Sequence, residues 1–160
     1  MQLVFLPHWL TVLLFFILWP LFHIGTAMLC FYMPDSAFAQ DNRLYKTRKW
    51  EQGGALYERV FGIKKWKRHL PDGGAWFKGG YSKKHIKNFG ARNLDTFLLE
   101  SRRAELTHWL AILPFWVFGL FAPWYIVPVM LVYALAANLP CILTQRYNRP
   151  RVQKLRAKQT

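Results

Sequence analysis

Acidic residues and cysteines are both scarce in this chain. Among its 160 residues there are 8 Asp and Glu against 22 Lys and Arg, and only 2 cysteines. Cys30 and Cys141 lie inside apolar segments, which argues against the disulfide framework of a small secreted protein. No zinc-ligand spacing occurs either. We therefore expect no bound metal, and two cysteines that act as small hydrophobic side chains.

Two common catalytic signatures are also missing. The chain has neither the serine of a nucleophile elbow nor a glycine-rich loop that cradles phosphate. Instead it has 53% hydrophobic residues, 18% aromatic residues and a strongly basic balance, a combination unusual for a soluble domain. The two properties are segregated, because residues 35–103 and the tail from Arg146 hold all 22 cations. This pattern predicts a mainly α-helical, small polytopic membrane protein with one basic side.

Residues 1–34 form the first expected element. Ala37-Phe38-Ala39 imitates a signal-peptide cleavage site, but no Lys or Arg precedes the apolar run of 31 residues, which exceeds the usual signal core of about 7–15. We therefore expect a retained, signal-like transmembrane helix. It would be about 46 Å long, against a hydrocarbon core of roughly 30 Å. Pro20 is expected to mark a kink, or the end of a tilted span.

Residues 94–145 are expected to form a transmembrane helical hairpin. Its arms, residues 106–121 and 124–143, are separated by Ala122-Pro123, a turn too short to leave the membrane surface. The first arm is short, so its helix should begin earlier, with Asn93 or Asp95 as N-cap. Asn148, before Arg149-Pro150, should end the second helix. Three prolines should bend these helices: Pro114, Pro128 and Pro140.

Residues 35–93 interleave aromatic side chains with cations. Such a pattern also occurs in nucleic-acid-binding proteins. Between membrane spans, however, it favours an interfacial segment on the anionic inner leaflet, where each Lys or Arg contributes about 1 kcal/mol. The expected partner is therefore membrane lipid and not nucleic acid. A turn at residues 70–74 should split the segment into short helical pieces at residues 48–67 and 81–88.

The distribution of cations also predicts an orientation. Cytoplasmic loops carry an excess of Lys and Arg, so the segment 35–93 and the tail 146–160 should both be cytoplasmic. With three spans, Met1 and the turn at Pro123 lie outside. The expected location is the cell membrane, with a multi-pass topology.

Glu105 and His108 are the first candidates for catalysis. Three residues apart on a helix, they share a face and can touch. A carboxylate beside an imidazole orients the ring and strengthens it as a base, which is what removal of a hydroxyl proton requires. In one alternative, His108 is an interfacial anchor and Glu105 pairs with Arg102 or Arg103. A di-iron half-site is a further possibility, but it needs a second Glu-x-x-His motif that the chain lacks.

Other polar residues have two interpretations each. Arg146 and Arg149 can bind phosphate or carboxylate bidentately, or they can serve as a positive-inside stop signal. The Asn148 amide can hydrogen-bond a sugar hydroxyl. Asp72, before two glycines, is either a turn residue or a substrate ligand. His23 lies in the first apolar run, where a polar group is costly and often functional, although it can simply bond a carbonyl group.

Several blocks of the sequence resemble a known family. They are Met33-Pro34-Asp35 with Phe38, Lys64-Lys65-Trp66-Lys67 through Asp72-Gly73, Glu100 with Arg103-Ala104-Glu105-Leu106 and His108-Trp109, Ile112-Leu113-Pro114, Ala137-Asn138 with Pro140, and Gln145 to Arg151. In this order they resemble the glycosyl-4,4'-diaponeurosporenoate acyltransferases, membrane enzymes that add a fatty acyl group to a sugar hydroxyl of staphyloxanthin-type carotenoids. The resemblance extends over nearly the whole chain.

The resemblance implies an O-acyltransferase acting on a glycosylated carotenoid, or on a related isoprenoid glycolipid. No cofactor is expected, and the acyl donor would be a thioester such as acyl-CoA or an acyl-carrier protein. His108 would deprotonate the acceptor hydroxyl and Glu105 would orient His108. The matched blocks contribute the expected substrate-binding residues: Arg103, Asp72, Asn138, Arg146, Tyr147, Asn148 and Arg149. A protein of another class, a non-catalytic lipid-binding or scaffolding membrane protein, is the alternative.

Overall fold

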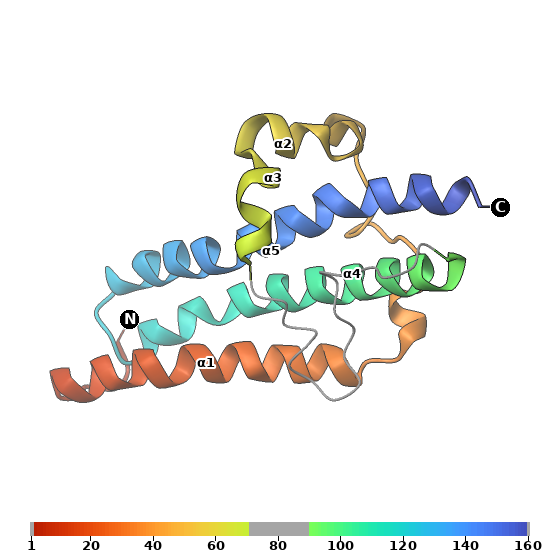
Figure 1. Ribbon diagram of the computed structural model, residues 1–160. Helices are drawn as coiled ribbons and strands as arrows, with labels where there is room; N and C mark the ends of the chain where they lie inside the picture. The colour runs from red at the N-terminus through yellow and green to blue at the C-terminus, as the bar shows by residue number, and fades with distance from the viewer. Residues whose placement is uncertain (1, 71–89, 160) are drawn as a thin grey trace. The chain divides into compact units, whose positions relative to one another are not determined.

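The computed structural model describes residues 2–70 and 90–159, which are mainly helical, as the sequence predicts (Figure 1). In chain order the elements are α1 (His8–Tyr32), η1 (Asp35–Phe38), η2 (Lys49–Gly54), α2 (Ala55–Phe61), α3 (Ile63–Trp66), η3 (Lys67–His69), α4 (Ala91–Ile112), η5 (Leu113–Leu120) and α5 (Ile126–Ala157), where η marks a 3-10 helix. Contacts divide the chain into two units. Unit 1 comprises Met1–Met33 and Leu106–Leu139, and unit 2 comprises Pro34–Glu105 and Pro140–Thr160.

Helix α1 carries most of the first apolar run. Its 25 residues correspond to about 38 Å at 1.5 Å per residue. Pro20 lies inside the helix, so it does not mark the end of the span. The helix ends instead at Tyr32, because Met33 takes the extended backbone (φ −67°, ψ 141°) favoured before a proline, here Pro34.

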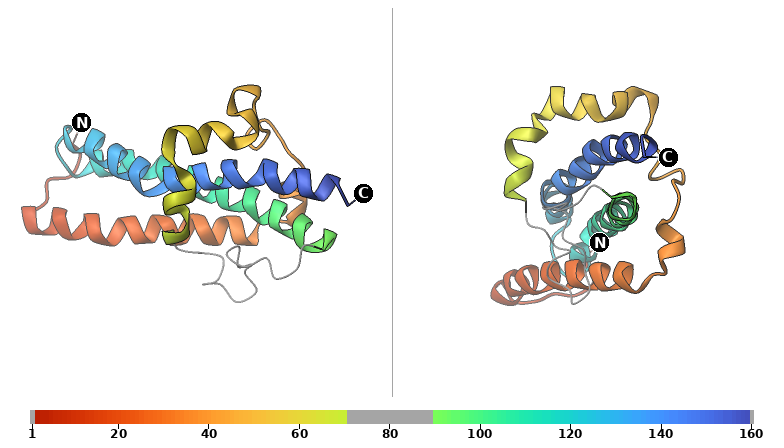
Figure 2. Two further views of the ribbon diagram at one scale, coloured as in Figure 1. Left: turned by 45° about the horizontal axis from the view of Figure 1, so that its top comes forward. Right: turned by 45° about the vertical axis from the view of Figure 1, so that its right-hand side comes forward.

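Unit 1 packs around aromatic rings. The ring of Trp19 on α1 lies 5.0 Å from the ring of Phe118 on η5 and 5.0 Å from that of Tyr133 on α5, measured between centroids. Figure 1 accordingly shows η5 alongside α1, and Figure 2 shows the same elements from two further directions. Many other large apolar side chains of the unit are exposed, among them Phe5, Trp9, Phe16, Trp124 and Val132. Helices α1 and α5 are both long and apolar enough to cross a membrane, which indicates membrane association.

The start predicted for the first helix of the hairpin needs correction. Helix α4 already begins at Ala91, so Asn93 and Asp95 are within the helix and neither is its N-cap. At Leu113 the helix tightens into η5, where Pro114 occupies the first turn. The change from an α-helix to a 3-10 helix is expected here, because proline removes one backbone hydrogen-bond donor from the α-helical pattern.

Helix α5 does not end at Asn148 as predicted; it continues through Pro150 to Ala157. The side chains on either side of this proline explain the continuation. Tyr147 is packed against Tyr57 and Ile63, and Val152 is packed in a second cluster with Leu94, Phe97 and Leu98. Burial of these apolar groups offsets the hydrogen bond that Pro150 cannot make.

Unit 2 has several short helices where the sequence predicted one at residues 48–67. Gly62 interrupts the helix with a left-handed conformation (φ 57°), and its N–H caps α2 by bonding the Glu58 carbonyl. Gly54 (φ 86°) permits a close approach, since a Cβ there would lie 2.9 Å from the Tyr147 carbonyl oxygen. The short helices thereby pack on the second half of α5 (Figure 1). The piece predicted at residues 81–88 lies outside the described residues.

Candidate functional site

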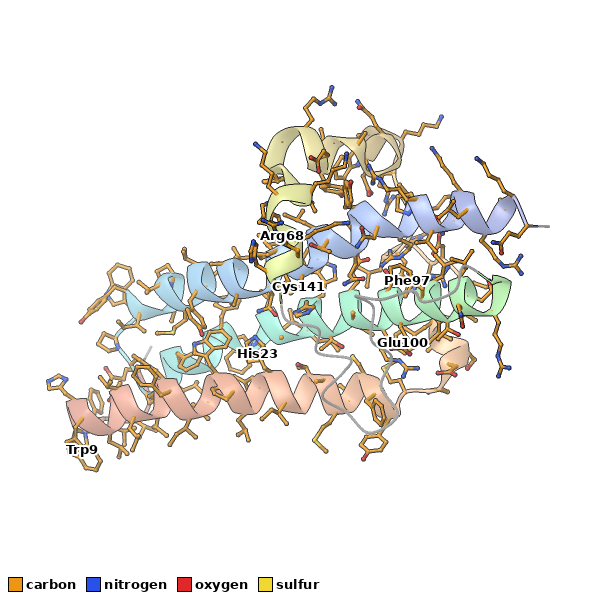
Figure 3. The ribbon with its side chains drawn as sticks, in the orientation of Figure 1. Trp9, His23, Arg68, Phe97, Glu100 and Cys141 are labelled. Carbon is orange, nitrogen blue, oxygen red and sulfur yellow. The ribbon has the colours of Figure 1, made fainter. Side chains whose placement is uncertain are left out.

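His108 in unit 1 belongs to a chain of hydrogen bonds contributed by three helices. Its Nδ1 lies 2.9 Å from Oδ1 of Asn138 on α5. The Nδ2 of Asn138 lies 2.9 Å from the Ala134 carbonyl oxygen and 3.4 Å from Nε2 of His23 on α1. His23 in turn places Nδ1 at 2.9 Å from the Trp19 carbonyl oxygen. Figure 3 shows His23 on the side of α1 toward α4, whereas Trp9 points away.

The order of donors in this chain determines the tautomer of His108. A carbonyl oxygen only accepts, so His23 must donate through Nδ1, and its Nε2 accepts from the Asn138 amide. The amide oxygen of Asn138 then faces His108 and accepts from an N–H at Nδ1. In the neutral ring the second nitrogen, Nε2, therefore carries the lone pair. A ring held this way is oriented to take a proton through Nε2.

Asn138 holds its position because both ends of its amide are satisfied. The side chain is fully buried, where an unpaired amide would cost roughly 1–3 kcal/mol. Its bond to Ala134, one turn earlier on α5, fixes the amide plane. The sequence predicted Asn138 as a substrate ligand through the family resemblance; the structure places its amide oxygen against His108.

In unit 2, Glu105 lies between two arginines of α5. Its Oε1 accepts from Nε of Arg146 at 2.8 Å, and its Oε2 accepts from Nη2 of Arg149. Arg146 also donates through Nη1 to Glu51 at 2.7 Å. Glu105 and Glu51 are fully buried, and Arg149 is 1% exposed. Buried charges of this kind require paired partners, and the two glutamates and two arginines supply them to one another.

Backbone carbonyl groups also accept hydrogen bonds from this buried ionic network, which we define as Glu51, Glu105, Arg146 and Arg149. Arg149 donates to the carbonyl oxygens of Tyr45 at 2.9 Å and Ser101 at 3.2 Å. The network also affects its surroundings, because burial and the negative charge of Glu51 raise the pKa of Tyr57 to about 12. Arg146 and Arg149 were predicted as substrate ligands, and in the structure their guanidinium groups pair with Glu51 and Glu105.

The other residues predicted to bind substrate do not share one set of contacts. Arg103 forms an ion pair with Asp35, and its Nη1 lies 3.4 Å from Oε1 of Glu100. Tyr147 is 2% exposed, and Asn148 accepts a hydrogen bond from Lys67 Nζ at 3.0 Å. Asp72 lies outside the described residues. The described part of the chain contains no group of three or more His, Cys, Asp or Glu side chains placed to hold a metal.

Sequence reasoning gave little weight to His23 and none to Glu51. His23 was one isolated polar group in an apolar run, and nothing in its spacing indicated Asn138, 115 residues later. The composition did offer a signal for Glu51. The chain has 8 acidic residues against 22 basic ones, so each acidic residue is a candidate partner for a buried arginine.

Comparison with known proteins identifies the family. A family model described as glycosyl-4,4'-diaponeurosporenoate acyltransferase matches residues 41–158. The chain belongs to this family. A glycosyl-4,4'-diaponeurosporenoate acyltransferase from Staphylococcus haemolyticus is 36% identical over 135 residues, covering 84% of this chain and 78% of the relative. One from Staphylococcus aureus is 32% identical over 137 residues, covering 86% and 82%. No solved structure matches the chain significantly.

As a member of the glycosyl-4,4'-diaponeurosporenoate acyltransferase family, the protein is an acyltransferase. The range matched by the family model includes His108, Asn138 and the whole buried ionic network, but it begins after α1. His23 therefore comes from a segment that the family model does not cover.

Proposed function

We propose that the protein transfers a fatty acyl group from a thioester donor to a sugar hydroxyl of a glycosylated carotenoid or a related glycolipid. The names of its relatives support the acceptor class. The observation that carries the chemistry is the 2.9 Å hydrogen bond between His108 Nδ1 and Asn138, because it leaves His108 Nε2 as the basic nitrogen. No cofactor takes part.

In the proposed reaction, His108 Nε2 removes the proton of the acceptor hydroxyl while that oxygen attacks the thioester carbonyl carbon. Asn138 keeps accepting from Nδ1–H as the ring becomes an imidazolium. The tetrahedral intermediate then collapses, the carbon–sulfur bond breaks, and the thiolate takes the proton back from Nε2. The products are an ester on the sugar and a free thiol, and His108 returns to its starting form.

We further propose that the enzyme crosses the membrane three times, through α1, the apolar stretch of residues 106–121, and the first part of α5. The exposed apolar side chains of unit 1 support this, because hydrocarbon is the environment that such a surface favours. The positive-inside rule then places the basic residues 35–103 and the tail from Arg146 on the cytoplasmic side.

Substrate-binding roles for Arg103, Asp72, Tyr147 and Asn148 remain proposals carried by the family resemblance. For Arg146 and Arg149 we propose a primarily structural role. Each already donates to Glu105, and Arg149 is almost fully buried, so a substrate would have to displace a carboxylate.

The function is tested with the purified full-length protein in phosphatidylcholine nanodiscs, supplied with radiolabelled acyl-CoA and a glycosylated carotenoid. We expect label in an alkali-labile ester on the sugar, and a loss of about 10²–10⁴-fold in kcat for His108→Ala, the contribution typical of a general base. His8→Ala is the matched control, because His8 lies at the start of α1, outside this hydrogen-bond chain. Full activity of His108→Ala refutes the mechanism. Absence of labelled ester with acyl-CoA refutes the proposed combination of donor and acceptor.

A further inference from the structure

Two cations in unit 2 share one aromatic ring. The guanidinium carbon of Arg151 lies 3.6 Å from the ring centroid of Tyr147, and Lys67 Nζ lies 4.9 Å from the same centroid. Lys67 also donates to the Asn148 amide oxygen at 3.0 Å. One Nη of Arg151 donates to the Tyr147 carbonyl. Two helices, η3 and α5, thus bring two positive charges together.

Among the residues that the structure describes, these two cations have no carboxylate partner, unlike the arginines around them. Arg102, Arg146 and Arg149 each form an ion pair of 2.8 Å or less with Asp or Glu. Within residues 2–70 and 90–159, no carboxylate lies within 4.0 Å of Lys67 Nζ or of the Arg151 guanidinium. The described oxygens that they do contact belong to a neutral amide and a carbonyl group.

The positive charges of Lys67 and Arg151 repel each other at this distance. Burial and the positive charges of Arg151 and Lys64 lower the pKa of Lys67, and only Glu58 opposes them. Holding like charges together without a counterion costs free energy, although both side chains, each half-buried, would reach water if they turned outward. An anion bound between them would convert this repulsion into attraction.

The backbone at Gly54 and the ring of Tyr147 both restrict the position of the Arg151 guanidinium group. A Cβ at Gly54 would lie 2.7 Å from Arg151 Nη1, so the absence of a side chain there leaves room for the guanidinium group. The stacking of Arg151 on Tyr147, itself 2% exposed, restricts the group further. A pre-organised guanidinium with a flexible ammonium beside it matches phosphate, which accepts from both.

We propose that Lys67 and Arg151, with the amide of Asn148, form a binding site for a phosphate group. The proposal deepens the proposed function and rests on it for the source of the phosphate, which is either the nucleotide end of a coenzyme A thioester or the headgroup of an anionic lipid. Asn148 contributes its NH2 group as a further donor, since its oxygen already accepts from Lys67. The site thereby holds a phosphate-bearing molecule to unit 2.

Binding is measured with the full-length protein in nanodiscs, without any acyl transfer. In one arm, coenzyme A is titrated into protein in phosphatidylcholine nanodiscs by calorimetry. In the other, the fraction of phosphatidylglycerol retained by the protein after exchange into phosphatidylcholine is quantified. The test variant is Lys67→Gln with Arg151→Gln. The matched control is Lys49→Gln with Lys158→Gln, which removes the same charge from exposed positions of unit 2.

We expect affinity for one of the two phosphate compounds to fall at least tenfold in the test variant and to change less than twofold in the control. Loss for coenzyme A alone assigns the site to the donor, and loss for phosphatidylglycerol alone assigns it to a lipid headgroup. Equal losses in test and control variants, or no binding of either compound by the wild type, would each overturn the proposal. His108→Ala should bind normally, so failure of the catalytic mechanism is distinguishable from failure of this site.

Discussion

The Nδ1 atom of His108 lies 2.9 Å from the side-chain oxygen of Asn138, and the hydrogen-bond acceptor that orients this imidazole is therefore an amide. A neutral amide holds the ring as well as a carboxylate does, but it contributes no negative charge to an imidazolium. The geometry thus favours brief protonation of His108 during transfer.

The first prediction concerns Asn138. Asn138→Ala removes the acceptor for His108 Nδ1–H, so the ring can rotate or change tautomer. Because misplacement of a catalytic group by about 1 Å costs on the order of 10²-fold, we expect kcat to fall by about 10–100-fold with a smaller change in KM. Asn138→Gln, which keeps an amide donor and acceptor, should lose less. Steady-state kinetics in nanodiscs measure both, and equal losses in the two variants would contradict the orienting role.

The second prediction concerns His23, which we infer is a positioning residue. Without its Nε2, one N–H of the buried Asn138 amide loses its acceptor, so only the bond to Ala134 holds the amide that orients His108. We expect His23→Leu to lower kcat about tenfold, since residues in one hydrogen-bond network are coupled by roughly 0.5–3 kcal/mol. His23→Gln, which offers both a donor and an acceptor, should restore most of the activity.

A double-mutant cycle separates positioning from a general effect on folding. In an Asn138→Ala background, His23→Leu should cause no further loss, because the amide that it holds is gone. Thr26→Val is the matched control on α1, as the Thr26 hydroxyl bonds only carbonyl groups of its own helix, those of Phe22 and His23. Additive losses would show that His23 acts independently of Asn138.

Local spacing predicted part of this site, and long-range packing supplied the remainder. Three-residue spacing correctly places Glu105 and His108 on one helix, α4, and the apolar runs correctly indicate α1 and α5. No local pattern, however, specifies that Asn138 meets His108 or that Arg149 meets Glu105, 44 residues away. The end predicted for α5 at Asn148 failed for the same reason, since packing on both sides of Pro150 outweighed the local effect of proline.

The third prediction tests the buried ionic network. Glu105→Ala leaves the guanidinium group of Arg149 buried without its carboxylate, and loss of one partner of a buried pair costs about 3–5 kcal/mol. We expect a clear drop in the thermal midpoint measured in detergent. Asp95→Ala is the control, because the Asp95–Arg156 pair is exposed and such pairs contribute little. An unchanged midpoint for Glu105→Ala, combined with lost activity, would instead favour the catalytic role first predicted for Glu105.

The fourth prediction concerns alkaline pH. The pKa of Tyr57 is about 12 in the folded protein against 10.0 for a free side chain, so the unfolded chain loses this proton first as pH rises. The stabilising contribution is complete below pH 10 and disappears between pH 10 and about 12. Tyr57→Phe lacks this group, so the wild type should lose stability relative to the variant only in that window. Parallel pH dependence of the two thermal midpoints would contradict the assignment.

The fifth prediction distinguishes two membrane crossings from three. If only α1 and α5 cross, Lys49 and Lys158 lie on opposite sides, whereas a third crossing between them places both on the cytoplasmic side and Trp124 outside. Single cysteines at these three positions, in a background with Cys30 and Cys141 replaced by alanine, are treated with a membrane-impermeant maleimide. We expect labelling of intact cells only at Trp124→Cys, and labelling at all three after permeabilisation. Labelling of Lys158→Cys in intact cells would reduce the number of crossings to two, and residues 106–121 would then lie in the interface.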